Sequence, residues 1–193
     1  MKADKSTIQR LKLLPHLFRI QDAQKVAPHT GTFLYRATQD GLIRRLNRGS
    51  YVNAFLYGSP AVEMVACFLR PPAYISCEWA LNYHGVLLQS PHVCSVVTLH
   101  TAVGKGRGFD YQGVTIEFSR IATRLFHGYT TNHGVSMASA EKALLDTLYL
   151  HHHIPTADEL EIDSLDLRKL REMSGYYPGN IRLRIEELIN RKA

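Results

Sequence analysis

The segment from Thr32 to Val52 most constrains the fold, because a helical pattern there is followed by a glycine and two short extended stretches. Thr32 to Asp40 places its apolar residues on one side of an expected helix, and Gly41 suits the left-handed conformation at which helices commonly end. Asn47-Arg48-Gly49 has the composition of a tight turn between two strands. A helix followed by such a ribbon is typical of a winged helix-turn-helix, which we predict for residues 1–57.

Two further helices are expected ahead of this segment. The first begins at Ser6 and places four apolar residues on one side, with Pro15 leaving its end open: Ile8, Leu11, Leu14 and Leu17. The second runs from Ile20 to Ala27 and is followed by a turn over residues 28–31. Together with the helix from Thr32, they supply the helices that this fold requires.

The net positive charge of the chain is confined to its first third. The 193 residues carry a formal charge of +6. Residues 1–58 contain ten Lys or Arg and three acids, whereas residues 59–193 contain thirteen Lys or Arg and fourteen acids. A basic module joined to a near-neutral one indicates binding to a polyanion through the first module.

The helix expected from Thr32 has one polar face. Thr32, Tyr35, Arg36 and Gln39 recur at the spacing that brings side chains to one side of a helix. Arg and Gln can each make paired hydrogen bonds to base edges in the major groove, whereas Thr and Tyr more often contact phosphates. The alternative for this face is a surface that contacts only solvent.

The ribbon carries Arg44, Arg45 and Arg48, a positive charge that a hairpin does not need in order to fold. Beside a duplex these side chains would contact the phosphate backbone or enter the minor groove. The predicted partner is therefore double-stranded DNA, and the predicted DNA-binding residues are Thr32, Tyr35, Arg36, Gln39, Arg44, Arg45 and Arg48. Winged helices also mediate protein contacts, so a protein-interaction module remains the alternative.

The rest of the chain, residues 58–193, is expected to form a separate α+β domain. Turn residues cluster over Tyr57 to Pro60, where the charge balance also changes. Helices are expected over residues 61–69, 78–84, 139–150, 163–173 and 180–191, and extended segments over residues 73–76, 93–99 and 114–118. Helices mixed with a few strands indicate the α+β class.

No arrangement of residues in the sequence identifies a catalytic, cofactor or metal site. The segment Gly104 to Gly108 resembles a phosphate-binding loop only in composition, and we interpret it as a basic loop. His151, His152 and His153 are adjacent, so on a helix they diverge and do not converge on one ion. We therefore predict no catalytic residues, no cofactor and no metal. An enzyme that modifies nucleic acid, with its site in residues 58–193, is the less favoured alternative.

Three smaller features complete the expectations. Ser139 is expected to cap the helix that follows, with Glu141 in its first turn. The position of Asp146 in the middle of that helix is less easily explained, and we expect its carboxylate to bind a neighbouring backbone group or a partner. Three scattered cysteines indicate free thiols in a reducing compartment. The polar start and the lack of a long apolar run predict a cytoplasmic protein without a membrane segment.

Three segments resemble a known family. Residues 41–52 (GLIRRLNRGSYV) resemble the G-L-I-x-R-x-x-R-G-x-Y wing of AbiEi-type antitoxins. Residues 75–85 (ISCEWALNYHG) are similar to the family's I-S-x-x-S-A-L-x-x-H-G segment, with Trp79 in place of the usual small residue. Residues 137–146 (MASAEKALLD) resemble its A-x-x-E-K-A-L-L-D helix.

The resemblance implies a transcriptional regulator of a type IV toxin–antitoxin pair. Such antitoxins bind inverted repeats at their own promoter through the winged helix and repress the operon. Their C-terminal domain is needed to counteract a nucleotidyltransferase-like toxin, without a stable complex between the two proteins. Members of the family also occur outside such operons.

Overall fold

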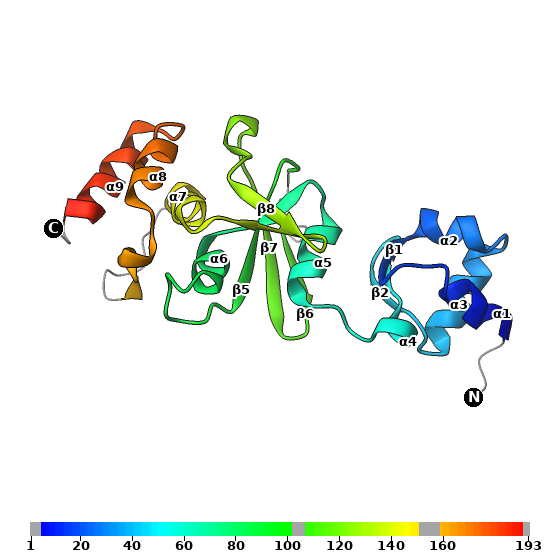
Figure 1. The fold of residues 1–193 in the computed structure, drawn as a ribbon. Coiled ribbons are helices and arrows are strands. Elements are labelled where there is room, and N and C mark those ends of the chain that lie inside the picture. The colour runs from blue at the N-terminus through cyan, green and yellow to red at the C-terminus, as the bar shows by residue number, and fades with distance from the viewer. Residues whose placement is uncertain (1–4, 102–106, 151–158, 191–193) are drawn as a thin grey trace. The chain divides into compact units, whose positions relative to one another are not determined.

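The computed structural model describes residues 5–101, 107–150 and 159–190. The chain divides into two compact units, residues 1–61 and 62–193, so the boundary lies slightly beyond the one expected after Tyr57. Each unit mixes helices with strands, and the described residues form nine α-helices and two sheets (Figure 1). The expected α+β class is confirmed.

The first unit combines short helices with a three-stranded sheet. Its elements are α1 (Lys5–Leu11), β1 (Leu17–Arg19), α2 (Ile20–Val26), α3 (Thr30–Gln39), β2 (Arg44–Asn47), β3 (Ser50–Val52) and α4 (Ala54–Tyr57). The sheet is antiparallel in the order β1-β3-β2, so β3 is its central strand. In Figure 1 this unit runs from blue to cyan.

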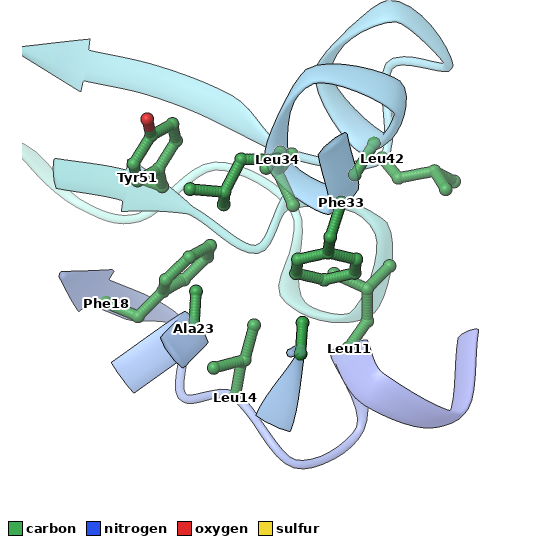
Figure 2. Packing of buried hydrophobic residues seen from close by; sticks show 11 residues of the cluster. Leu11, Leu14, Phe18, Ala23, Phe33, Leu34, Leu42 and Tyr51 are labelled. Atoms are coloured by element: carbon green, nitrogen blue, oxygen red, sulfur yellow. The ribbon is translucent and has the colours of Figure 1, made fainter. Parts of the chain in front are cut away.

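A single apolar core holds the helices of the first unit on its sheet. Figure 2 shows this core, to which α1, α2, α3 and the sheet all contribute buried side chains. The rings of Phe18 on β1 and Tyr51 on β3 stack with their centroids 5.5 Å apart. Phe33 and Leu34 enter the core from α3 and are each 5% exposed. Burial of each large apolar side chain contributes about 1.5–3 kcal/mol, which fixes α3 against the sheet.

Gly41 ends α3 as expected from the sequence. Its φ is +70°, and it donates its N–H to the carbonyl of Thr38 at 3.0 Å. Leu42 donates to the carbonyl of Ala37 at 2.9 Å, which completes a Schellman motif. The motif satisfies the last carbonyls of the helix and turns the chain toward β2.

Two expectations for the first unit were wrong. The first helix ends at Leu11, and Leu17 begins β1, because Pro15 lacks the N–H that a helix needs and disfavours helical geometry at the residue before it. The expected two-stranded ribbon is therefore a three-stranded sheet. In addition, α3 begins at Thr30, so part of the expected turn over residues 28–31 is helical. The second helix was placed correctly.

The second unit is built on a six-stranded mixed sheet. Its strands are β4 (Ala73–Ile75), β5 (Val93–Thr98), β6 (Gly108–Tyr111), β7 (Val114–Arg120), β8 (Tyr129–Asn132) and β9 (Val135–Ala138). Their order is β6-β7-β5-β4-β9-β8, with parallel pairing only for β5 with β7 and for β4 with β9.

Five helices accompany this sheet: α5 (Val62–Leu69), α6 (Cys77–Tyr83), α7 (Ala140–Leu150), α8 (Leu167–Ser174) and α9 (Gly179–Asn190). The helices α5 and α6 pack against the sheet, and α6 also packs against α7. The helices α8 and α9 pack together and against α7 (Figure 1). The helix expected from Asp163 begins only at Leu167, after a separate 3-10 turn over Ile162–Ser164.

Three strands of the second unit were not expected from the sequence, namely β6, β8 and β9. The hairpin of β6 with β7 turns at Gln112-Gly113, and the hairpin of β8 with β9 turns at His133-Gly134. All four turn residues have positive φ, which is the geometry of a type I′ turn.

Some sequence expectations concern residues outside the described ranges. Most of the segment Gly104 to Gly108 and the run His151, His152 and His153 belong to them. Within the described ranges, none of the helices combines the length and apolar character needed to span a membrane. Cys67, Cys77 and Cys94 are free and buried.

Candidate nucleic-acid interface

The helix α3 presents the four residues singled out from its sequence on its exposed side. Thr32, Tyr35, Arg36 and Gln39 are all exposed, and Tyr35 is 66% accessible. The opposite side of α3 is buried in the core of the first unit. Between the expected residues, Thr38 uses its hydroxyl within the helix, donating to the carbonyl of Leu34 at 2.8 Å. The exposed face of α3 therefore offers one guanidinium, one amide and two hydroxyls.

The three arginines of the hairpin are exposed but do not form one group. Arg44 pairs with Val52 at the open end of the hairpin, and its Nη2 lies 3.5 Å from Oγ of Ser59. Arg45 is the next residue of the strand, so it faces the other side of the sheet. Its Nε donates to the carbonyl of Asn47 at 3.0 Å, and Arg48 occupies the turn. The sequence grouped these side chains, whereas the structure separates Arg44 from the other two.

Arg19 is a basic residue of this surface that the sequence prediction missed. It ends β1, pairs with Ser50 and lines a hollow of about 520 Å³ together with Gln21, Arg45 and Arg48. The only signal in the sequence was a basic residue directly before the second helix. Its proximity to the hairpin arises from the pairing of β1 with β3, which sequence reasoning did not anticipate.

The first unit has few acids to offset this charge. Residues 1–61 contain ten Lys or Arg and only three Asp or Glu. Among these acids, Asp22 accepts the backbone N–H of Arg19 at 3.0 Å and the ammonium of Lys25 at 3.1 Å. These two hydrogen bonds lower the pKa of Asp22, so its carboxylate is ionised at neutral pH. Even with this carboxylate ionised, the excess of basic over acidic residues leaves the unit with a net positive charge.

In the second unit, Asp146 belongs to a buried polar cluster that consists of Tyr74, Ser76, Lys142, Asp146 and Tyr177. Lys142 and Asp146 have fully buried side chains and form an ion pair at 2.5 Å. The carboxylate also accepts hydroxyls from Tyr74 at 2.9 Å, Ser76 at 2.7 Å and Tyr177 at 2.7 Å. Asp146 thus has its partners within the protein.

The environment of this cluster explains its protonation states. Burial raises the pKa of both tyrosines above the ordinary value, and the Asp146 carboxylate raises it further, so both hydroxyls stay protonated and donate. Burial lowers the pKa of Lys142, and the adjacent carboxylate counters that effect. The hydrogen bonds of the cluster link β4, α7 and the α8–α9 segment. Neither charged side chain contacts solvent, so the cluster does not form an open site.

Other residues of the resembling segments also make structural contacts. Ser139 Oγ accepts the N–H of Lys142 at 3.3 Å and donates to Glu141 at 2.8 Å, which confirms the expected cap. Nε2 of His84 lies 2.7 Å from the carbonyl of Ala138. Trp79 donates its indole N–H to Glu63 at 3.1 Å and so links α6 to α5. Segments 75–85 and 137–146 therefore meet within the core of the second unit.

The enzyme alternative would place its site in the second unit. Among the described residues, no group of three or more His, Cys, Asp or Glu is arranged to hold a metal ion. A hollow of about 350 Å³ is lined by residues that include Glu78, His92, Ser95 and Glu117. One of these carboxylates, that of Glu117, is already paired with Arg107 at 2.5 Å.

The comparisons with known proteins do not identify the chain. No protein-family model matches it, and no curated protein sequence matches it. Function is therefore inferred from the geometry of the first unit and from the three segments that resemble AbiEi-type antitoxins.

Proposed function

We propose that residues 1–61 form a winged helix-turn-helix that binds duplex DNA in a sequence-specific manner. In this proposal α3 enters the major groove and the β2–β3 hairpin lies beside it as the wing. The observation that carries the proposal is the exposed face of α3, with Arg36 and Gln39 on a helix whose other side is fixed in the core. A rigid helix with these side chains is suited to reading base edges.

The charge of the first unit supports the same proposal. Phosphate contacts supply much of the affinity of DNA-binding proteins and make it depend on salt. The exposed arginines of the hairpin lie on β2 and in the turn after it, directly following α3 in the chain, so they are available for the DNA backbone when α3 is in the groove. Base contacts then discriminate between sequences, while the arginines bind all sequences alike.

We further propose that the protein is a transcriptional repressor and the antitoxin of a type IV pair, which counteracts a nucleotidyltransferase-like toxin. This step rests on the three resembling segments. Two of them meet in the core of the second unit, where Ile75 pairs with Met137 and Ser76 bonds to Asp146. Because the two segments contact each other, a family with the fold of this second unit would need both of them together.

The DNA-binding proposal is tested by selecting duplexes from a random library with the full chain at physiological salt. Binding of the selected duplex is then measured by fluorescence anisotropy at several salt concentrations. Arg36→Ala should cost about 1–3 kcal/mol and relax specificity at one base pair. The control is Arg182→Ala on α9, which removes the same charge from an exposed position of the second unit. Equal loss in both variants, or no selected duplex, would contradict the proposal.

The antitoxin proposal is tested in cells. If the adjacent gene encodes a nucleotidyltransferase-like protein that arrests growth, co-expression of this chain should restore growth. Arg36→Ala should abolish repression of a promoter reporter but still restore growth, because the second unit is unchanged. Persistent arrest with the wild-type chain would refute the antitoxin role and leave DNA binding to be judged separately. Copurification of a protein partner without any selected duplex would favour the interaction module.

A further inference from the structure

The hollow beside the hairpin turn has a composition that fits an anion. Arg19, Arg45 and Arg48 line it together with Gln21, and none of the described residues that line it is acidic. We propose that these three arginines together bind one phosphate group of the DNA backbone. The proposal rests on the proposed function of residues 1–61 and adds Arg19 to the interface.

The backbone holds the two sides of the hollow in a fixed arrangement. Arg19 is paired with Ser50 across the β1–β3 ladder, and the N–H of Ile20 donates to the carbonyl of Gly49 at 2.9 Å. The end of β1 is thereby tied to the hairpin turn at Arg19 and at the residue that follows it. A site whose backbone is fixed before binding loses less conformational entropy when it takes a ligand.

The guanidinium groups bring N–H donors to the lining of the hollow. Arg19 Nη1 lies 3.5 Å from the Ser50 hydroxyl, a contact that directs the half-buried side chain along the sheet. Arg45 uses only Nε in its bond to Asn47, and the side chain is exposed. Arginine presents its N–H groups as a planar fork that matches phosphate oxygens, and such charge-assisted bonds are the stronger ones.

The nearest acid in the sequence, Asp22, does not line the hollow. Its carboxylate accepts the backbone N–H of Arg19 and the ammonium of Lys25, and it also interacts electrostatically with the charge of Arg19. Arg44 does not line the hollow, and its Nη2 lies near Oγ of Ser59. The hollow is therefore lined by three positive side chains and by no acid among the described residues.

A phosphate held here would set the register of the protein on the duplex. Phosphate contacts orient a protein without reading sequence, whereas α3 reads the bases. Arg19 is therefore a positioning residue for α3, and its loss should weaken binding to every sequence. Arg19, Arg45 and Arg48 should also act on the same phosphate, which distinguishes one shared site from three independent surface contacts.

The experiment is a scan of the selected duplex in which a neutral methylphosphonate replaces one phosphate at a time. For the full-length wild type, replacement at the phosphate that occupies the hollow should weaken binding about tenfold, as expected for hydrogen bonds to a charged group. In Arg19→Gln and in Arg48→Gln that position should lose its effect while the others keep theirs. The salt slope should fall by about 1 for each variant.

Arg44→Gln is the matched control, since it removes the same charge from the same hairpin but from outside the hollow. It should leave the effect of the identified phosphate intact. Circular dichroism and the unfolding midpoint of each variant show that it is folded, and Arg48 in the exposed turn provides a second variant that does not depend on Arg19.

The outcomes separate this proposal from the one on which it rests. If the wild-type chain selects no duplex, the DNA-binding function itself fails. If it selects a duplex but Arg19→Gln leaves every methylphosphonate effect unchanged, only the phosphate site fails. If Arg19→Gln and Arg48→Gln abolish the methylphosphonate effect at different phosphates, the shared site is likewise overturned.

Discussion

Replacing Asp146 by Asn should strongly destabilise the second unit. The substitution keeps the size of the side chain but leaves the fully buried ammonium of Lys142 without a counter-ion. Removing one partner of a buried ion pair costs about 3–5 kcal/mol. With a urea m-value of about 2 kcal/mol/M, the unfolding midpoint should fall by about 1.5–2.5 M.

The single tryptophan of the chain, Trp79, provides the assay. It lies on α6 in the second unit, so its fluorescence in a urea titration reports unfolding of that unit. The deficit of Asp146→Asn should shrink as the pH is raised toward 10.5, the ordinary lysine value. Burial lowers the pKa of Lys142, and in the wild type the Asp146 carboxylate counters this effect, so the variant has the lower lysine pKa in the folded state. The unfolded variant then binds more protons than the folded one over a wider pH interval, and its stability rises with pH more than that of the wild type.

A double-mutant cycle tests the reasoning behind this magnitude. Lys142→Met should also be destabilising on its own, because it leaves the buried carboxylate of Asp146 unpaired. The double variant should cost less than the two single costs combined, by a coupling energy of a few kcal/mol, because neither charge remains. A loss below about 1 kcal/mol for Asp146→Asn, or strict additivity in the cycle, would refute a charged pair that acts as a unit.

Two predictions concern the first unit. Asn53 is fully buried and donates its amide to the carbonyls of Leu11, which ends α1, at 2.8 Å and of Leu14, in the turn that follows, at 3.2 Å. Asn53→Ala should therefore cost about 2–3 kcal/mol in a thermal melt. The exposed Asn132→Ala is its control, and equal melting temperatures for the two variants would contradict the role of the amide. The backbone of Arg19 and the ammonium of Lys25 lower the pKa of Asp22, so its contribution to stability is complete above the unfolded value of 3.8 and is lost as the pH falls through the folded value. Asp22→Asn should therefore remove part of the acid-induced loss of stability, measured by urea titrations between about pH 2 and 5, and an unchanged pH profile would oppose this.

The best-predicted part of the fold is the segment around α3. Its apolar and polar residues follow the helical period without interruption, and Gly41 marks the end where a positive φ is needed. Both signals are local, so they can be read from consecutive residues. The exposed candidate residues of α3 were identified for the same reason.

The errors occurred where local pattern and tertiary structure disagree. Leu14 and Leu17 continue the spacing set by Leu11, but the helix ends at Leu11. Pro15 lies between the other two leucines, and the strand that follows has only three residues. A strand of that length has no periodicity of its own, and its existence depends on pairing with β3. Arg19 was missed as a consequence.

The hairpins of the second unit were missed because their turns lack the usual sequence signal. Asn-Gly and Asp-Gly mark type I′ turns because Asn and Asp tolerate positive φ, whereas this chain uses Gln112 and His133 before glycine. The buried polar cluster was missed for a different reason. The spacing of Lys142 and Asp146 indicates a pair on one helix face, but only the fold brings Tyr74 and Tyr177 around it.

The three cysteines allow the opening of the second unit to be measured by chemical labelling. All three are buried in that unit, and the first unit contains none. Burial raises the pKa of Cys67, Cys77 and Cys94, so the reactive thiolate is scarce while the unit is closed. The rate of alkylation by a thiol reagent therefore measures how often this unit opens, in purified protein or in living cells, and it does so without any engineered label.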